Sequence, residues 1–249
     1  MTVKTNDGKI NDMKIALISD IHGNIPALEA VYKSILDKNI SEIYNLGDSC
    51  YGPLWPEETA QFIIKNNIIS IMGNGDEDLI KYPLKNETVK YIISQLSEKS
   101  INWIKNLPAI YENNDVTLFH GSPNNSGKYF LEKIVNKQIV IKSNDEIKET
   151  IKDIKSKYIC FGHSHLERIL KINDQILINA GSVGLPAYLE NEPEHKIETF
   201  NNYAKYVIIE NRNIEICNVE YDYKSSCKKA EENNRNDWST CIKYGRIIE

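Results

Sequence analysis

The sequence predicts a mixed α/β fold (α+β overall), in which two mixed β-sheets pack together and helices cover their outer faces. Short apolar runs that end in polar turns alternate with amphipathic stretches up to about residue 106, which is typical of alternating strands and helices. From residue 167 onward, Asn-containing turns separate the apolar runs and favour antiparallel hairpins. No Gly/Ser linker or fixed repeat interrupts the chain, so we expect one domain over residues 1–249, with a polar tail from about 224 that these patterns describe less well.

The first element is an apolar strand at residues 14–20. A helix follows, because Pro26 suits a first turn, apolar residues recur at helical spacing after it, and Asn24 is a good N-cap. The same order then repeats, with a strand at 42–46, a helix at 56–65 and a strand at 68–72. Helical stretches at 87–99 and 101–106 end at Pro108.

The second half of the chain predicts strands at 115–119 and 158–161, with a polar-faced helix at 145–155 between them and an irregular loop at 122–144. Hairpin strands follow at 167–172, 175–179, 205–210 and 214–220. In the tail, Asp237 is predicted to cap a last short helix.

The charge and hydropathy of the chain argue against several classes of protein. Lys and Arg number 30 against 35 Asp and Glu, a net charge of −5, so no broad positive field would attract nucleic acid or anionic lipid in general. No apolar run reaches the roughly 20 residues of a membrane span, and the polar first dozen residues carry no targeting signal. The five cysteines include no Cys-x-x-Cys pair, which favours reduced thiols in a cytoplasmic protein.

Metal-ligating side chains follow the predicted strands at the points where these strands end. The set comprises Asp20, His22, Asp48, Asn74, His120, His163 and His165. Side chains at the carboxyl ends of neighbouring strands converge on one crevice. Carboxylate, imidazole and amide ligands without cysteine suit Mn, Fe, Zn, Co or Ni. Seven donors exceed one tetrahedral ion but suit two divalent ions that share a carboxylate, for which Asp48 is the natural bridge.

Such a pair of ions has a defined chemistry. Two ions about 3.5–4 Å apart bind a water molecule between them, lower its pKa and hold an ester for in-line attack. With two divalent ions, Asp20, Asp48 and a bridging hydroxide, the site keeps about one positive charge. The sequence therefore predicts a small phosphate ester as the substrate.

Five ordered motifs at the predicted strand ends resemble those of one enzyme family. They are Asp20-Ile21-His22-Gly23-Asn24, Gly47-Asp48, Gly73-Asn74-Gly75-Asp76, His120-Gly121 and Gly162-His163-Ser164-His165. This set resembles the calcineurin-like metallophosphoesterases, and residues 179–186 are similar to a segment of the small bacterial phosphodiesterase branch. The resemblance extends to about Tyr223 and implies a four-layer sandwich of two mixed sheets flanked by helices.

The resemblance also implies ligand sets and roles. The first metal would be held by Asp20, His22, Asp48 and His165, and the second by Asp48, Asn74, His120 and His163. Manganese is the leading candidate for both sites. A hydroxide that bridges the metals would attack phosphorus, and Asn74 would face a phosphate oxygen.

Position 75 departs from the family pattern. Many relatives carry a histidine there, to which protonation of the leaving oxygen is assigned, whereas this chain has Gly75 followed by Asp76. No arginine follows Gly47-Asp48 as it does in the protein phosphatases, and all four arginines lie outside the motifs. Because a phosphoserine dianion would lack its bidentate clamp, phosphodiesters are the favoured substrates.

Several other residues have both a structural and a functional interpretation. Asn24 caps a helix or contacts phosphate, and Asp76 is better explained as a helix N-cap than as a catalytic group. Ser182 and Gly184 offer backbone donors to a substrate or belong to a tight turn into Pro186. His195 lies in a charged stretch and is expected at the surface, with a substitute acid as the alternative.

The sequence as a whole predicts a dinuclear metal-dependent phosphoesterase, preferably a phosphodiesterase. The alternatives are a metal-bound scaffold or interaction protein on the same fold, as in the retromer subunit that resembles these enzymes, and a phosphomonoesterase or protein phosphatase. A scaffold would have lost ligands, whereas all seven ligand positions are filled here. The oligomeric state is left open.

Overall fold

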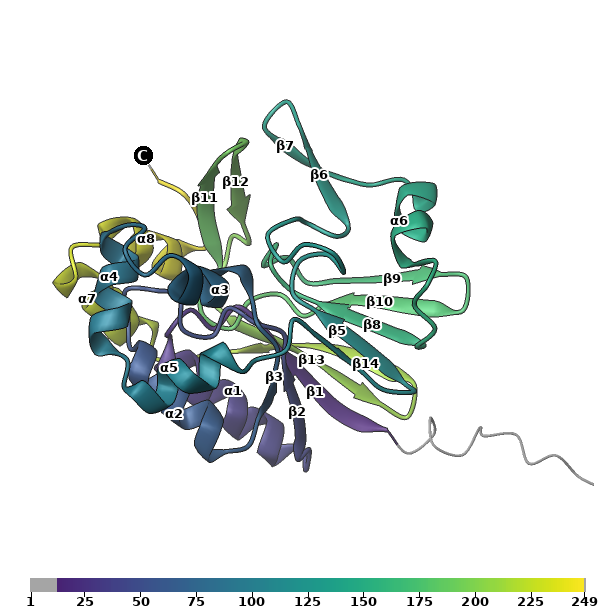
Figure 1. The fold of residues 1–249 in the computed structure, drawn as a ribbon, viewed down its shortest axis with the longest axis horizontal. Helices are drawn as coiled ribbons and strands as arrows, with labels where there is room; N and C mark the ends of the chain where they lie inside the picture. Colours follow the sequence, from purple (N-terminus) through teal and green to yellow (C-terminus); the bar gives the residue numbers. More distant parts are fainter. Residues whose placement is uncertain (1–12, 249) are drawn as a thin grey trace, which may run out of the picture.

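Two five-stranded mixed sheets form the centre of the computed structural model, which describes residues 13–248 (Figure 1). The first sheet has the strand order β14-β13-β1-β2-β3, with the bounds Asn213–Val219, Ala204–Glu210, Lys14–Ile18, Glu42–Asn45 and Ile69–Ser70. The second has the order β4-β5-β8-β10-β9, with the bounds Ile110–Glu112, Val116–Phe119, Tyr158–Phe161, Gln175–Asn179 and Arg168–Ile172. The predicted α/β class with two mixed sheets is confirmed.

Each sheet has a parallel centre and antiparallel edges. In the first sheet, β1 pairs with β2 and β2 with β3 in parallel, while β13 runs antiparallel to β1. In the second, β8 pairs in parallel with both β5 and β10, and β4 and β9 are antiparallel edge strands. The carboxyl ends of the parallel strands therefore lie at one edge of each sheet, where the loops carry the predicted ligands.

Apolar side chains at alternate strand positions separate the molecule into four layers. On β1, Ala16 packs against helices α1 (Ile25–Asp37) and α2 (Pro56–Lys65), whereas Leu17 packs between the two sheets. The outer face of the second sheet packs against α6 (Asn144–Ile151). The predicted four-layer sandwich is therefore confirmed.

Most predicted elements are present with small changes of boundary. Residues 56–65 and 158–161 form α2 and β8 with the predicted bounds, and Asn24 is the N-cap of α1. The two helical stretches before Pro108 form α4 (Glu87–Gln95) and α5 (Glu98–Lys105). Local signals of apolar spacing and capping thus place most elements of the first half.

The sequence does not predict two hairpins that project from the same side of the molecule in Figure 1. They are β6–β7 (Glu132–Val135 and Gln138–Ile141) and β11–β12 (Ala187–Asn191 and Glu194–Glu198). The first hairpin lies inside the segment expected to be an irregular loop, so that expectation is wrong there. Neither hairpin has the long apolar run of a sheet interior.

Helix α3 (Asn74–Lys81) is also absent from the predicted elements. Its N-cap is Gly73, whose N–H donates to the Asp76 carboxylate at 3.3 Å. Asp76 is the third residue of the helix, so its expected place as the N-cap is wrong. A capping contact from inside the first turn, rather than apolar spacing, marks the start of this helix.

The tail from about residue 224 is helical. It forms α7 (Tyr223–Glu232) and α8 (Asn236–Tyr244), which pack on each other and on Leu54 through a cluster that includes Trp238. The N-cap of α8 is Arg235, so the predicted capping role of Asp237 is wrong. The Asp237 carboxylate lies in the first turn and accepts from the Arg235 guanidinium instead.

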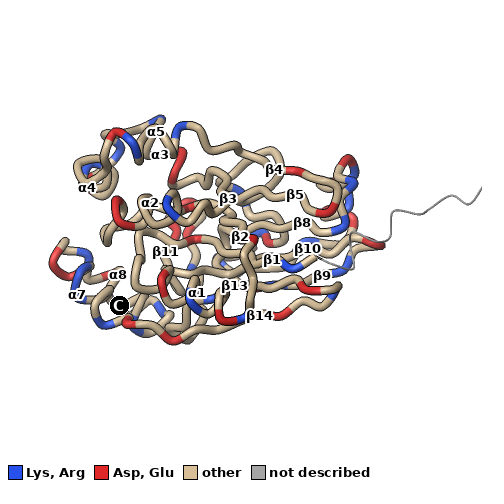
Figure 2. The backbone as a smooth tube through the Cα atoms, turned by 90° about the horizontal axis from the view of Figure 1, so that it is seen from below, with Lys and Arg blue, Asp and Glu red and all other residues tan. Residues whose placement is uncertain are grey.

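Acidic and basic residues are interspersed along the helices and at the strand ends of the described chain, without a basic stripe in this view (Figure 2). Among residues 13–248, no helix combines the length and hydropathy that a bilayer span requires. The five cysteines are free and buried. Burial raises the pKa of the Cys50 and Cys160 thiols, which suits a packing role.

Candidate metal centre

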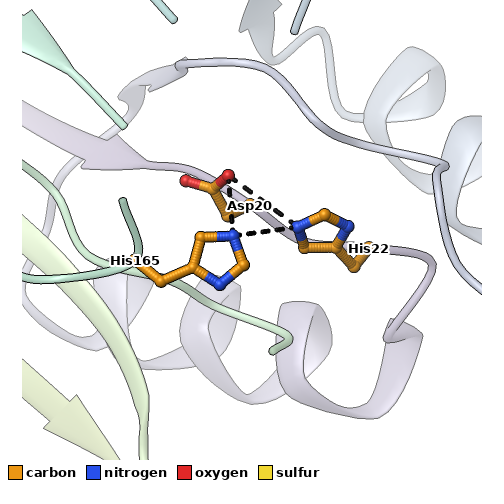
Figure 3. A group of neighbouring side chains, drawn as sticks. All are labelled: Asp20, His22 and His165. Carbon is orange, nitrogen blue, oxygen red and sulfur yellow. Dashed lines mark hydrogen bonds and ion pairs between the residues drawn. The ribbon is translucent and has the colours of Figure 1, made fainter. Parts of the chain in front are cut away.

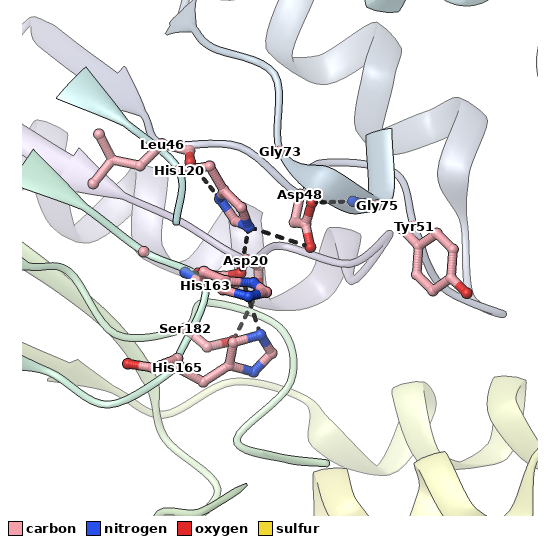
Figure 4. A network of polar contacts seen from close by, with 12 residues as sticks. Asp20, Leu46, Asp48, Tyr51, Gly73, Gly75, His120, His163, His165 and Ser182 are labelled. Carbon is pink, nitrogen blue, oxygen red and sulfur yellow. Dashed lines mark hydrogen bonds and ion pairs between the residues drawn. The ribbon is translucent and has the colours of Figure 1, made fainter. Parts of the chain in front are cut away.

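The predicted ligands converge at the carboxyl ends of the parallel strands. Figure 4 shows the side chains of Asp20, Asp48, His120, His163 and His165 pointing toward one another. Asp20 and Asp48 follow β1 and β2, His120 follows β5, and His163 and His165 follow β8. His22 lies two residues after Asp20, and Asn74 is the first residue of α3. Both sheets therefore contribute side chains to one centre.

Asp20, His22 and His165 form the first group (Figure 3). Nε2 of His165 lies 3.2 Å from Asp20 Oδ1, and Nε2 of His22 lies 3.8 Å from the same oxygen. The two Nε2 atoms are 3.1 Å apart. All three side chains are buried, and their ligand atoms lie within 4.8 Å of one another, close enough to hold one cation.

Backbone carbonyls fix the tautomers of three histidines. The Nδ1 atoms of His22, His120 and His165 lie 2.6, 2.7 and 2.5 Å from the carbonyl oxygens of Tyr51, Leu46 and Leu185, respectively. Because a carbonyl only accepts, each Nδ1 carries a hydrogen, and Nε2 is the ring atom left to bind a metal. In His22 and His165 the two Nε2 atoms face each other at 3.1 Å, an arrangement that a shared cation stabilises.

Asp20, Asp48 and His120 form a second group, which shares Asp20 with the first. Nε2 of His120 lies 3.8 Å from Asp20 Oδ1 and 3.5 Å from Asp48 Oδ2. The same Asp48 oxygen lies 3.9 Å from Nε2 of His22. Both aspartates therefore reach both groups, whereas the sequence points to Asp48 alone. Asp20 Oδ1 and His120 Nε2 are buried without a hydrogen-bond partner among the described residues, as a metal ligand would be.

Backbone N–H groups fix Asp48 and the loop that carries it. The Gly75 N–H donates to Asp48 Oδ1 at 2.7 Å, which leaves Oδ2 facing the histidines. The buried Asp76 carboxylate accepts from the N–H groups of Ser49 and Cys50, each at 3.1 Å. Asp76 therefore joins the loop after β2 to the start of α3.

Five of the candidate ligands have a backbone in the left-handed region. Their φ angles are 53° for Asp20, 54° for His22, 54° for Asp48, 68° for His163 and 56° for His165. Non-glycine residues rarely adopt this region, and such strain is retained where the surrounding structure imposes it, often at functional sites. The backbone thus singles out the same residues as the side-chain chemistry.

Asn74 and His163 lie on the side of the centre that faces a cavity, which they line together with His22 and Asp48. Asn74 Oδ1 is buried and has no hydrogen-bond partner among residues 13–248. The ring centre of His163 lies 5.1 Å from that of His120. These two side chains extend the second group toward the cavity.

Burial and neighbouring charges shift the pKa values of the candidate ligands. Burial would raise the pKa of Asp20, but His165 and His120 lower it to about 2. Burial would lower the pKa of His120, but the carboxylates of Asp48 and Asp20 raise it to about 10. Burial and the neighbouring His120 lower the pKa of His163 to about 4. At neutral pH the aspartates are ionised and His163 is neutral, as ligands must be, while His120 has a proton to release.

Two of the three residues predicted to contact substrate, Asn24 and Ser182, have structural partners. Asn24 is fully buried, where its Oδ1 accepts from Ser226 Oγ at 2.7 Å and its Nδ2 donates to Gly184 O at 2.8 Å. Ser182 Oγ donates to Asp20 O at 2.9 Å. Neither is among the described residues that line the cavity. Contact with a substrate remains a prediction for both residues. In the structure, their hydrogen bonds stabilise the loop that carries Asp20.

Tyr51 occupies the space beside Gly75, as Figure 4 shows. A Cβ at position 75 would lie 2.6 Å from Tyr51 Cβ and 2.8 Å from Tyr51 Cγ, far inside contact distance. Tyr51 also lines the cavity next to Asp48 and Asn74. Where the family pattern has a histidine, this chain therefore has a glycine, and the Tyr51 side chain fills the space beside it.

His195 is buried, so its expected surface location is wrong. On β12, Glu194 and Lys196 are exposed and His195 faces inward, because alternate strand residues point to opposite faces. Its Nε2 lies 2.7 Å from the Tyr129 hydroxyl, which in turn lies 2.7 Å from the Tyr188 hydroxyl.

Sequence reasoning missed two aromatic residues that touch the candidate ligands. The Tyr188 hydroxyl donates to His163 O at 3.1 Å, and its ring centre lies 4.6 Å from that of His165. Trp238 packs edge-on against His22, with ring centres 5.7 Å apart. Both come from elements after the last motif, and no local sequence signal marks them.

Residues 13–201 match the sequence profile of the calcineurin-like phosphoesterase superfamily domain. This chain belongs to that superfamily. The matched segment contains all seven candidate ligands, so the candidate metal centre of this calcineurin-like phosphoesterase lies within the family domain. Helices α7 and α8 lie outside the matched segment.

The calcineurin-like fold is shared over nearly the whole described chain. An uncharacterized protein of Methanocaldococcus jannaschii is 26% identical over 247 residues, which cover 90% of this chain and 94% of that protein. A metallophosphoesterase from Sphaerobacter thermophilus has a TM-score of 0.75 at 21% identity, covering 95% of this chain and 100% of that one. A hypothetical protein from Pyrococcus horikoshii has a TM-score of 0.73 at 18% identity, covering 94% and 99%.

Proposed function

We propose that this calcineurin-like phosphoesterase is a dinuclear metal-dependent phosphodiesterase. The observation that carries the proposal is the common orientation of three buried histidines, His22, His120 and His165. Each donates its Nδ1–H to a backbone carbonyl and directs Nε2 toward Asp20, Asp48 or both. Donors that are positioned in this way fit divalent cations.

The donor chemistry favours manganese, with Fe, Ni, Co and Zn as alternatives, because oxygen and imidazole ligands without thiolate suit these ions. One cation would lie among Asp20, His22, Asp48 and His165, and the other among Asp48, Asn74, His120 and His163. Asp20 lies within reach of both positions. When bound, the two cations supply positive charge to the phosphate and acidify a water molecule for attack on phosphorus.

Two groups of the protein itself act beside the cations: the Asn74 amide would orient the phosphate, and the start of α3 stabilises the Asp48 carboxylate. Asn74 presents an amide toward the cavity, where Nδ2 can donate to a phosphate oxygen while Oδ1 remains available to a cation. The Gly75 N–H at the start of α3 holds Asp48, and the positive end of the helix dipole favours the anionic side chain there.

A diester is favoured because Arg168 and Arg235 are already paired with acidic side chains. Arg168 Nε donates to the buried Glu132 at 2.8 Å. Arg235 lines the cavity, but its guanidinium donates to both oxygens of Asp237 and to Thr88 Oγ1. The second negative charge of a phosphomonoester or phosphoprotein would therefore lack a free guanidinium in this cavity.

The proposed substrate is a small phosphate ester, and the proposed location is the cytoplasm, where the free buried cysteines stay reduced. The test combines metal analysis of protein purified without chelators with kcat/KM for bis-p-nitrophenyl phosphate and p-nitrophenyl phosphate under added Mn, Ni, Co, Zn or Mg. We expect about two metal ions per chain and faster hydrolysis of the diester. Hydrolysis of neither ester with any metal would favour the scaffold alternative, and faster hydrolysis of the monoester would favour a phosphomonoesterase.

A further inference from the structure

The metal centre opens into a cavity of about 850 Å³, far larger than one phosphate group. Its walls come from three places: residues 85–88 at the end of the α3–α4 loop and the start of α4, strand β11, and helix α8. In Figure 1, α8 and the β11–β12 hairpin lie side by side above the ends of the sheets, and α8 contacts β11. The cavity therefore has room for a sizeable group beside the phosphate.

The basic side chains that line this cavity are paired with acids. Lys85 Nζ lies 2.6 Å from Asp78 Oδ2. Arg235 donates from Nε and Nη2 to the two oxygens of Asp237, at 2.8 and 2.6 Å. Charge that these cations would offer to a ligand is thus already neutralised within the protein.

Acidic residues outnumber basic ones on the cavity wall outside the metal centre. Besides Asp78 and Asp237, Glu190 and Glu87 line the wall, which gives four acidic side chains against two basic ones; of these, Glu87 pairs with Lys90 at 2.7 Å. Phosphate groups beyond the one held at the metals would face this acidic wall at short range. Like charges brought together in this way oppose binding.

The cavity also has an apolar and aromatic part, most of which comes from the same elements β11 and α8 that carry Glu190 and Asp237. This part is lined by Leu185, Ala187, Tyr188, Leu189, Trp238 and Ile247. Trp238 packs on His22 and Tyr188 on His165, so this surface begins at the metal centre and continues outward. A flat or apolar ester group would bury its surface here.

Resting on the proposed function, we propose that this cavity is the ester-group site and that it selects substrates with a single phosphate. The group attached to that phosphate is uncharged and partly apolar, as in aryl, nucleoside or alkyl phosphodiesters. Substrates that carry further phosphates, such as nucleoside polyphosphate esters and nucleic acids, are rejected. The reason is that the basic side chains of the cavity wall are already ion-paired and its acidic side chains are in excess.

The test compares two esters that release the same chromophore. These are the p-nitrophenyl ester of thymidine 5′-monophosphate and the p-nitrophenyl ester of the terminal phosphate of thymidine 5′-triphosphate, assayed with one metal at one ionic strength. We expect kcat/KM to be at least about tenfold higher for the monophosphate ester.

Two variants, one on α3 and one on α8, test whether the ion pairs on the cavity wall cause this ratio of kcat/KM between the two esters. Asp78→Asn releases Lys85, and Asp237→Asn releases Arg235, so each is expected to lower the ratio several-fold by improving the triphosphate ester. Glu149→Gln on α6, which breaks an exposed pair with Lys152 away from the cavity, is the matched control and should leave the ratio unchanged. Circular dichroism of each variant verifies that it is folded.

The outcomes separate this inference from the proposed function. If bis-p-nitrophenyl phosphate is hydrolysed but the triphosphate ester is as good a substrate as the monophosphate ester, the single-phosphate site is refuted and the phosphodiesterase stands. A high ratio that neither folded variant changes would also refute the inference. If no diester is hydrolysed with any metal, the proposed function itself fails.

Discussion

The Tyr129 hydroxyl lies 2.7 Å from Nε2 of His195 and connects a buried histidine to the edge of the metal centre. Nδ1 of His195 lies 2.6 Å from Pro193 O and therefore carries a hydrogen. The Tyr129 hydroxyl also lies 2.7 Å from that of Tyr188, whose hydroxyl reaches His163 O. His195 lies outside every motif, and it supports a candidate ligand only through contacts that the fold creates.

His195→Phe is expected to lower the free energy of unfolding by about 1–3 kcal/mol, because the Tyr129 hydroxyl and Pro193 carbonyl lose a buried partner. His195→Gln keeps a donor and an acceptor and should recover part of this loss. Urea unfolding measures both variants. Glu194→Gln, at the exposed neighbouring position, is the control and should stay within about 0.5 kcal/mol of the unmodified protein. Equal midpoints for His195→Phe and this control would contradict the buried role.

Asp48→Ala and Asp20→Ala are each expected to remove both metals and abolish activity. The reason is that each carboxylate lies within 3.9 Å of histidine nitrogens in both groups. His165→Ala should weaken one ion only, since His165 belongs to a single group. Metal content per chain by mass spectrometry is the readout.

The control for these variants is Asp145→Asn, an aspartate whose side chain is 98% exposed on α6, which should keep the full metal content. An Asp48→Ala protein that retains two metals and a near-normal rate would show that the carboxylate is not shared.

The protonation of His120 makes metal uptake release a proton. Its pKa rises from 6.5 to about 10 in the metal-free fold, so the protonated ring stabilises that fold fully below pH 6.5, and this contribution is lost as the pH rises toward 10. At pH 8, Mn²⁺ must displace this proton in order to bind Nε2. We therefore expect the metal affinity of the chelated protein to increase with pH across this window.

Isothermal titration calorimetry of the chelated protein with Mn²⁺, in buffers of different ionisation enthalpy, should detect about one released proton that His120→Gln no longer releases. Identical binding enthalpies in all buffers for the unmodified protein would show that His120 is already neutral.

Hydrolysis is expected to depend steeply on the pKa of the leaving group, because no imidazole stands at position 75. A positioned general acid contributes about 10²- to 10⁴-fold, most of it for poor leaving groups. The measurement is kcat/KM over a series from nitrophenyl to alkyl diesters. A shallow dependence would mean that another group already protonates the leaving oxygen.

Restoring an imidazole at position 75 needs room that Tyr51 now fills. Gly75→His alone should lose activity and stability, since its Cβ would lie 2.6 Å from Tyr51 Cβ. The double variant Tyr51→Gly/Gly75→His, in which the Tyr51 Cβ is removed, should raise kcat/KM for alkyl diesters more than for nitrophenyl esters when compared with Tyr51→Gly. Equal gains for both ester types would argue against a proton-donating role.

The sequence predicts elements whose start and end are encoded locally. Helix α2 begins at Pro56 and keeps its predicted bounds, and β8 is a short, fully buried apolar run. Helix α3 is missed because its sequence is rich in acidic residues and contains Gly75, and its first turn is held by Asp76 contacts to another loop. Tertiary contacts outweigh propensity there.

The sequence predicts the candidate ligands as well as it predicts the strand ends that carry them. The candidate ligands converge as the topology requires, but the sequence cannot show that Asp20 is shared as well as Asp48, since that depends on side-chain distances between two sheets. The burial of His195 did have a signal, because His195 and Ile197 alternate with charged residues on one strand.

The contacts of α7 and α8 have a consequence for the order in which the centre is assembled during synthesis. Ser226 of α7 completes the hydrogen bonding of Asn24, and Trp238 of α8 covers His22, yet both are translated after every candidate ligand. A nascent chain that already carries its complete set of donors therefore still lacks one wall of its cleft. The interval before α8 docks is when the centre is most open to incoming metal ions, and the docking of α8 narrows that entrance.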